Sequence, residues 1–234
     1  MILGHRLSEW SGKAPMLEED IALSNLGLDL IGQARLYYQY AGEIEGKGRS
    51  EDDLAYLRDE HAYTNLLLVE QQNGDFAVTM VRQLLYSAFM LPYLQAMQTS
   101  RDARLADIAA KAVKEMAYHV RHASEWVIRL GDGTEESRGR AQAALDDLWM
   151  YTGEMFHARD DEAALIARGV AADRAALKPA WDTTIDRVLR EATLHRPRDG
   201  WMQTGGRDRQ HTEHLGRLLA EMQVIHRAHP GVTW

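Results

Sequence analysis

The sequence contains no cysteine among its 234 residues. This absence excludes disulfides, thiolate nucleophiles, cysteine-held iron–sulfur clusters and zinc ribbons, and it is typical of a reducing compartment. No run approaches the roughly 18 to 20 consecutive apolar residues of a membrane span. The first ten residues carry His5, Arg6 and Glu9, which is unlike a signal peptide. We therefore expect a cytoplasmic protein that does not enter a membrane.

Basic residues are also few relative to acidic ones. Lys and Arg number 27 against 35 Asp and Glu, which gives a formal net charge of -8 at pH 7. Binding to nucleic acid requires a basic face that neutralises phosphates, so we expect no nucleic-acid partner. Apolar residues make up 45% of the chain, an ordinary globular value that permits a sizeable buried core.

Proline is rare, with five in the chain, and apolar residues recur at steps of three and four. This periodicity predicts helices over residues 1–12, 15–42, 53–69, 75–99, 102–130, 134–157, 173–194 and 210–228. Asp102 is the expected N-cap of its helix. No strand pattern longer than four residues is present, so the predicted fold class is all-α. We expect one domain over residues 1–234, with a bundle core over about 1–158 and a C-terminal helical extension over about 159–234.

The same periodicity indicates which side chains face the core. His119 falls between Met116 and Ala123 in the apolar series of its helix, and Ser87 falls in the series of the helix over 75–99. The helix over 15–42 is apolar nearly all round, which is typical of the centre of a bundle. Its glycines, Gly27 and Gly32, each cost helix stability and therefore predict close contact with another helix.

A metal centre is the first chemistry to weigh for this core. Carboxylate-bridged di-iron sites in four-helix bundles take a Glu from each of two helices and Glu-x-x-His from each of the other two. The chain contains no Glu-x-x-His, and the nearest approach spaces Glu115 and His119 by four. Met116 stands where a ligand is needed, and a thioether is a poor ligand for such iron. We interpret His119 as a core histidine with a hydrogen-bond partner, with ligation as the alternative.

Two weaker patterns lie near the C-terminus. His211 and His214 stand at i and i+3, a spacing that could bind a transition metal but lacks a third ligand nearby. We favour the interpretation that these histidines lie at the N-terminus of a helix that its own preceding loop holds in place. The preceding Gly-rich loop, 204–209, could cradle a phosphate, yet it lacks P-loop spacing and follows no strand. A solvated or subunit-contacting loop is favoured there.

Several stretches carry a resemblance to a known family. They are Gly4-His-Arg-Leu-Ser-Glu-Trp10, Leu28-Asp-Leu-Ile-Gly-Gln-Ala-Arg35, Asn65-Leu-Leu-Leu-Val-Glu-Gln71 with Asn73-Gly-Asp-Phe76, Lys114-Glu115 with Tyr118-His119, and Thr204-Gly-Gly206 with His211-Thr-Glu-His-Leu-Gly216. In this order, and over nearly the whole chain, they resemble the C-subunit family of the phenylacetyl-CoA ring epoxidase, the multicomponent monooxygenase of phenylacetate degradation. The resemblance implies a ferritin-like four-helix bundle with additional C-terminal helices. Family members carry more chain before the first stretch, so a short first bundle helix is expected.

The resemblance also implies how the work is divided among subunits. A homologous catalytic A subunit would carry the di-iron centre, and a separate reductase would carry flavin and an iron–sulfur cluster. This chain would be a non-catalytic structural subunit without a cofactor, joined by further small subunits and by self-association. By resemblance, the degenerate di-iron positions are Glu9, Leu30, Gln33, Ser87, Met116 and His119. Only Glu9 and His119 retain ligand chemistry, and we expect a buried polar cluster of Glu9, Asp29, Gln33 and His119 in place of the metal.

Two alternatives remain open. The chain could itself be a di-iron oxygenase that uses Asp29, Glu115 or Glu125, which its iron content would reveal. It could instead be a helical homo-oligomeric scaffold with no enzyme partner, which co-purification would reveal. The aromatic run at 37–40 would serve either an oligomer contact or a core beneath the loop beyond Gly42.

Overall fold

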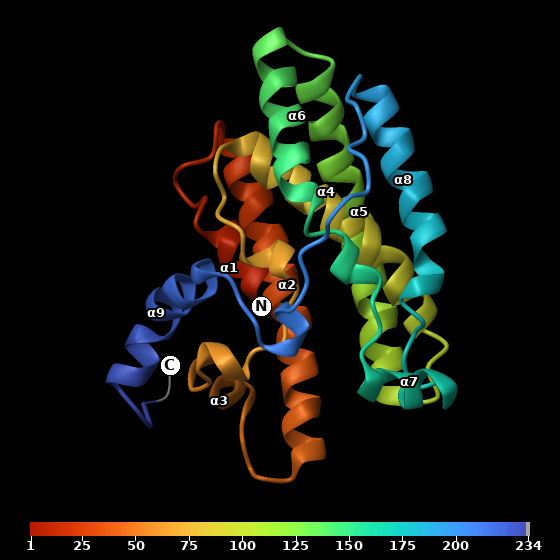
Figure 1. Cartoon of the computed structure of the whole chain (residues 1–234). Helices are drawn as coiled ribbons and strands as arrows, with labels where there is room; N and C mark the ends of the chain where they lie inside the picture. Colours follow the sequence, from red (N-terminus) through yellow and green to blue (C-terminus); the bar gives the residue numbers. More distant parts are fainter. Residues whose placement is uncertain (233–234) are drawn as a thin grey trace. The chain divides into compact units, whose positions relative to one another are not determined.

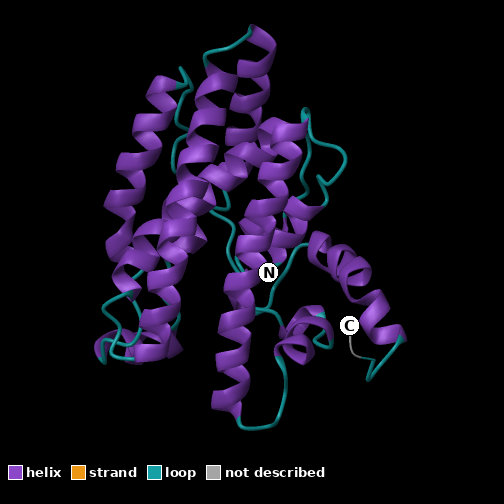
Figure 2. Cartoon of the chain, turned by 180° about the vertical axis from the view of Figure 1, so that it is seen from behind, coloured by secondary structure: helices purple, strands orange, loops and turns teal. Residues whose placement is uncertain are grey.

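The computed structural model describes residues 1–232, and every regular element in that range is a helix (Figures 1 and 2). The all-α prediction is confirmed, and the long helices are consistent with a ferritin-like fold. The chain divides into two compact units. The first unit joins residues 1–72 to the C-terminal segment from 204 onward, and the second comprises 73–203. The expected extension over 159–234 is therefore shared between the units, and a single-domain organisation remains a prediction.

The first unit combines the two ends of the chain, so the red and blue ends of the ribbon belong to one unit in Figure 1. Its helices are α1 (Ile2–Ser8), α2 (Leu17–Glu45), α3 (Glu51–Tyr56) and α9 (Glu213–Ala228), with 3-10 turns at Glu60–Ala62, Leu67–Glu70 and Gly206–Asp208. Helix α1 packs on α2, and α9 packs on α3. The first helix is shorter than predicted, because its last turn opens after Ser8.

Two glycines bring α1 and α2 close together. A Cβ on Gly27 would lie 3.2 Å from the backbone oxygen of Gly4, and one on Gly4 would lie 2.9 Å from the Ile31 side chain. The predicted close approach is thus confirmed for Gly27. It is wrong for Gly32, which is exposed and would have no heavy atom within 4 Å of its Cβ. The low helix propensity of glycine shows that the residue destabilises a helix, but it does not show on which face of the helix that glycine lies.

The predicted helix over 53–69 is also wrong, because α3 ends at Tyr56. Side chains from the following loop satisfy carbonyls of the last turn of α3: Arg58 donates to Leu54 O, and the Tyr63 hydroxyl donates to Ala55 O. Arg58 also donates to Ala62 O. The Arg58 guanidinium also lies 5.1 Å from the ring centre of Tyr38. Tyr38 therefore contacts the loop after α3, and both interpretations of the aromatic run at 37–40 remain predictions.

The second unit is built on the antiparallel pair α4 (Phe76–Met97) and α5 (Ala103–Gly131). Its other helices are α6 (Glu135–Trp149), α7 (Asp160–Ala167) and α8 (Lys178–Glu191). Asp102 caps α5 as predicted, since its carboxylate accepts the Leu105 N–H at 3.1 Å. Helix α6 ends eight residues before the predicted end at 157, and a 3-10 turn at Gly153–Phe156 follows it.

Helix α8 is fixed to this pair by a buried tryptophan. Trp181 is 1% exposed, and its indole N–H donates to Leu85 O of α4 at 3.0 Å. Its ring meets Phe156 edge to face at 5.3 Å. An aromatic residue of this size contributes a large part of the burial that holds a peripheral helix, and the paired N–H removes the cost of burying its polar atom.

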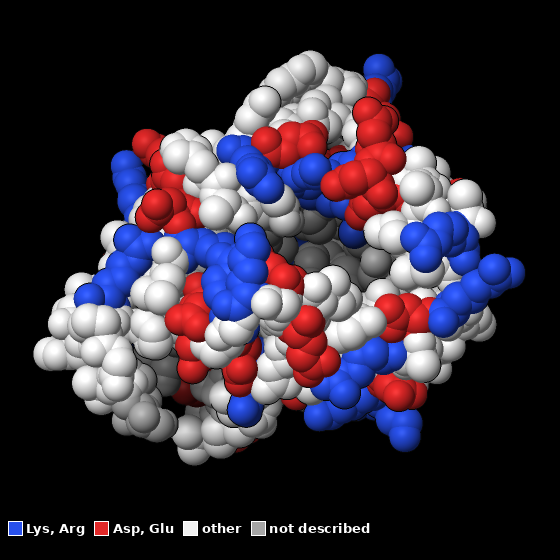
Figure 3. All heavy atoms as spheres, turned by 90° about the horizontal axis from the view of Figure 1, so that it is seen from below, with Lys and Arg blue, Asp and Glu red and all other residues white. Residues whose placement is uncertain are grey.

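On the face drawn in Figure 3, Lys and Arg side chains are interspersed with Asp and Glu. Within residues 1–232, no helix has both the length and the apolar character needed to cross a bilayer.

The contact between the ends of α5 and α8 gives a testable prediction. Gly131→Ala should destabilise the protein by about 1 to 3 kcal/mol, since overpacking forces backbone shifts. Its Cβ would lie 2.1 Å from the backbone oxygen of Ala192. Gly139→Ala is the matched control: it has nothing within 4 Å, and its helix should gain up to about 1 kcal/mol. Denaturant melts that gave both variants the same midpoint would contradict this packing.

Candidate functional site

The second unit contains a buried pair of polar side chains. His119 is fully buried, and its Nδ1 lies 3.0 Å from the Gln83 side-chain amide nitrogen on the facing helix. In this orientation Nδ1 can accept from the amide NH₂, and within residues 1–232 the Gln83 side-chain oxygen has no hydrogen-bond partner. The interpretation of His119 as a core histidine with a partner is confirmed. The identity of that partner, Gln83, was not predicted from the sequence.

Ser87 and Met116 lie on the same two helices and are fully buried, as expected from their spacing. The Ser87 hydroxyl turns back to Leu84 O of its own helix at 3.4 Å. Met116 presents only a thioether. Glu125, one of the carboxylates weighed for an oxygenase, is exposed, and Glu115 is half-buried.

The other degenerate positions lie in the first unit. Leu30 and Gln33 are buried on α2, and Asp29 is half-buried beside them. Glu9 departs from its expected burial: its side chain is 37% exposed and pairs with Arg6 at 2.8 Å. The reason is local, because α1 ends at Ser8 and Glu9 is its C-cap. A polar cluster that joins Gln33, Asp29 and His119 remains a prediction.

The residues at these positions do not fit a di-iron centre. Leu30 has no ligand atom, Met116 offers a sulfur that hard iron disfavours, and the Ser87 hydroxyl is committed to its own helix. The one imidazole among them, His119, already uses Nδ1 with Gln83. Throughout residues 1–232, no group of three or more His, Asp or Glu side chains is arranged to hold a metal ion.

An extensive polar network of the first unit was not predicted. Glu70 is fully buried at the end of the Leu67–Glu70 turn and accepts four hydrogen bonds. His211 Nδ1 donates to Oε1 at 2.5 Å and Asn65 Nδ2 at 2.8 Å, while Thr212 donates to Oε2 through its N–H at 2.9 Å and its hydroxyl at 2.8 Å. Arg6 donates to the Glu70 backbone oxygen at 2.7 Å. The network binds α1 and the start of α9 to one turn.

The partners of His211 determine its charge. Nε2 lies 3.0 Å from the Tyr63 backbone oxygen, and Nδ1 faces the Glu70 carboxylate, so both ring nitrogens meet acceptors. This arrangement favours the doubly protonated ring, the imidazolium. Burial lowers the pKa of His211, but the hydrogen bond and the charge of Glu70 outweigh it, and the pKa is raised above 6.5.

This network settles the two weaker sequence patterns. His211 contacts Glu70 and Tyr63, and Thr212 is the N-cap of α9, so the docked helix N-terminus is the correct interpretation. The prediction of a solvated or subunit-contacting loop is wrong for Gly205 and Gly206, which are buried within this chain; a Cβ on Gly206 would lie 2.4 Å from Asn65 O. A glycine is required there because only its backbone can approach so closely.

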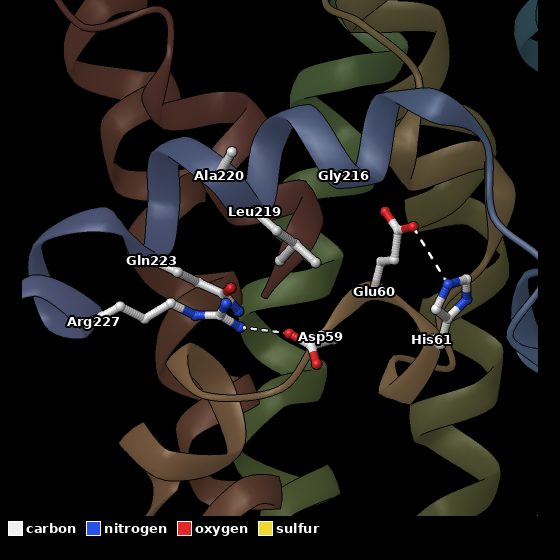
Figure 4. A pocket seen from close by; sticks show the side chains of 8 residues that line it. All are labelled: Asp59, Glu60, His61, Gly216, Leu219, Ala220, Gln223 and Arg227. Atoms are coloured by element: carbon white, nitrogen blue, oxygen red, sulfur yellow. Dashed lines mark hydrogen bonds and ion pairs between the residues drawn. The ribbon is translucent and has the colours of Figure 1, made fainter.

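A surface hollow of about 390 Å³ lies between α9 and the loop after α3 in the same unit (Figure 4). Arg227 reaches Asp59 at 3.0 Å on one side, and His61 lies 3.6 Å from Glu60 on the other. Leu219 and Ala220 form its apolar part. Arg227 offsets one of its two carboxylates, and its lining residues include no nucleophile–base pair.

Comparison with known proteins identifies the family. Residues 1–234 match the family described as phenylacetic acid catabolic protein. The chain belongs to this family. The resemblance inferred from the sequence motifs is thereby confirmed. A curated relative of the phenylacetic acid catabolic family, the C subunit of 1,2-phenylacetyl-CoA epoxidase of Escherichia coli (strain K12), is 47% identical over 234 residues. That alignment covers 100% of this chain and 94% of the relative.

The buried pair on α4 and α5 gives a prediction for this family member. His119→Leu should cost about 1 to 3 kcal/mol, because it leaves the buried Gln83 amide without its partner. The double variant His119→Leu/Gln83→Leu should lose less unfolding free energy than the two single variants lose together, since both polar groups are removed at once. Denaturant melts of the three variants measure this coupling, and strictly additive losses would contradict the pairing.

The Glu70–His211 pair predicts a pH dependence of stability. The folded-state pKa of His211 is raised, so its stabilisation is complete below about pH 6.5, the value of an unfolded histidine. It is lost as the pH rises through the folded-state pKa. The difference in unfolding free energy between the wild type and His211→Gln should therefore shrink from about pH 6 to about pH 9. A constant or growing difference would show that His211 is not charged in the fold.

Proposed function

We propose that this chain is the non-catalytic structural subunit of a phenylacetyl-CoA epoxidase and acts in aerobic phenylacetate degradation. The observation that carries the proposal is the relatedness over its entire length to a protein named as the C subunit of that enzyme. We also propose that the chain is cytoplasmic and forms a single ferritin-like domain.

The chemistry of the core supports a structural role. The positions where a di-iron bundle needs carboxylates hold Leu30, Met116 and the self-bonded Ser87. The buried histidine pairs with an amide, His119 with Gln83, instead of pointing toward an open ligand position. Within residues 1–232, these side chains form no ligand set that would hold and activate iron. We therefore place the di-iron centre in a homologous catalytic subunit and the flavin and iron–sulfur cluster in a separate reductase.

A subunit without chemistry can still be required for turnover. A partner that binds only the folded catalytic chain stabilises that chain by mass action, and it can hold active-site helices in their productive arrangement. Exposed apolar residues on the helices are available for such contacts, among them those of α2 and α9 in the first unit. On this proposal, loss of assembly removes activity even though no residue of this chain touches the reacting atoms.

The test is reconstitution with the catalytic subunit and the reductase, with oxygen-dependent consumption of phenylacetyl-CoA as the readout. Met116→Leu conserves volume and should cost less than about 1.5 kcal/mol. It should leave turnover within a few-fold, as should Gln33→Leu. Omitting this chain should abolish turnover. The proposal fails if either variant removes activity while assembly, stability and iron content of the partner stay normal.

A further inference from the structure

The exposed face of α5 in the second unit carries a row of cations around one aromatic ring. Lys111, Lys114, Tyr118 and Arg121 are all exposed. They follow one another at steps of three, four and three residues, so they lie on one face of the helix. At the rise of an α-helix the row is about 15 Å long. It can therefore contact several groups of one ligand.

The three cations of this row are not neutralised by the protein. Within residues 1–232, no carboxylate forms an ion pair with any of them. On α6, by contrast, the exposed Arg140 pairs with Glu136 one turn away. The one acid inside the row, Glu115, is half-buried, and the exposed Asp107 and Glu125 lie one turn beyond its two ends. The row therefore presents positive charge that an anion from outside can neutralise.

Tyr118 is positioned by two neighbours on α5 while its ring stays at the surface. The Arg121 guanidinium lies over the ring, 5.2 Å from its centre, and the centre of the His122 ring lies 6.0 Å away. Tyr118 remains 39% exposed. Purine bases stack on aromatic rings and on guanidinium planes, and both are present here. Because these neighbours already order the side chain, binding to it has a low entropic cost.

On the basis of the function proposed above, we propose that this face of α5 binds the nucleotide end of an acyl-CoA. Tyr118 and Arg121 stack on the adenine, and Lys111 and Lys114 bind the phosphates. The related C subunit belongs to an enzyme named for phenylacetyl-CoA. The nucleotide end of such a molecule carries a purine, a diphosphate and a further phosphate on the ribose. One ligand thus supplies both the base and the negative charges that the row fits.

This contact agrees with a subunit that performs no chemistry. The nucleotide of an acyl-CoA lies at the opposite end of the molecule from the acyl group. Binding there holds the substrate without placing any residue of α5 near the reacting atoms. Binding energy from such a remote part of a substrate can still contribute to catalysis, because it offsets the cost of orienting the reacting end.

Calorimetric titration of the purified chain with CoA tests the proposal. CoA and adenosine 3′,5′-bisphosphate should both bind, whereas pantetheine, which lacks the nucleotide, should not. Inorganic pyrophosphate should bind more weakly than CoA, since it leaves the aromatic platform unused. ATP distinguishes a free adenine nucleotide from CoA as the source of the same groups. If pyrophosphate or ATP binds as tightly as CoA, the proposal is overturned.

Two variants with matched controls locate the site. Arg121→Gln should raise the Kd for CoA at least about fivefold, because the stacking platform is lost. Arg129→Gln is its control, since Arg129 lies 5.2 Å from the ring centre of Trp126 at the same spacing on the same helix. Lys114→Gln should raise Kd about two- to fivefold, and less at high salt. Lys13→Gln, at an exposed position in the first unit, should leave Kd unchanged.

Absence of CoA binding, or equal effects of each variant and its control, would also overturn the proposal. The titration uses no catalytic subunit, iron or turnover, so its failure is separate from a failure of the structural role. If CoA does not bind but reconstituted turnover requires this chain, the α5 site is wrong and the structural role stands. If CoA binds as expected but turnover does not require this chain, the structural role is wrong and the α5 site stands.

Discussion

Hydrogen bonds between buried polar side chains hold the helices of each unit in place. In the second unit, Gln83 and His119 bond to each other between α4 and α5, although within residues 1–232 the Gln83 side-chain oxygen has no partner. In the first, the Glu70 carboxylate takes four donors, one of them from a charged imidazole. Unpaired, either group would cost roughly 1 to 3 kcal/mol or more, so the surrounding helices are fixed by the geometry of these bonds.

The cost of burying charge separates this fold from a metal-bearing bundle. A di-iron centre concentrates carboxylates whose charge the metal compensates. Without the metal, inward carboxylates would repel one another in a medium of low dielectric constant. Leucine, methionine and serine at such positions remove that repulsion, and Met116 and Leu30 add apolar contacts instead. The histidine at these positions, His119, is hydrogen-bonded to Gln83. A structural role therefore agrees with the energetics of the core.

Much of the fold could be predicted from local patterns, because helix periodicity and capping are local. Asp102 as an N-cap and the burial of His119 and Ser87 followed from spacing alone. The Glu70 network could not be predicted, since Glu70 and His211 are separated by 141 residues. The one local sign of this network in the sequence was Glu70, an acidic residue directly after the apolar run Leu66–Val69. Glu9 was misplaced because spacing cannot show where a short helix ends, and the end of α3 depends on Arg58 and Tyr63 reaching its carbonyls.

In the proposed division of labour, this chain contributes structure and a partner contributes the chemistry. The decisive experiment is to purify the active epoxidase complex, separate the two homologous subunits under conditions that retain tightly bound metal, and measure iron in each. We expect close to two irons per catalytic subunit and a negligible amount in this chain, also after anaerobic iron loading of the isolated chain. Stoichiometric iron in this chain would show that it carries a metal centre of its own and is not only structural.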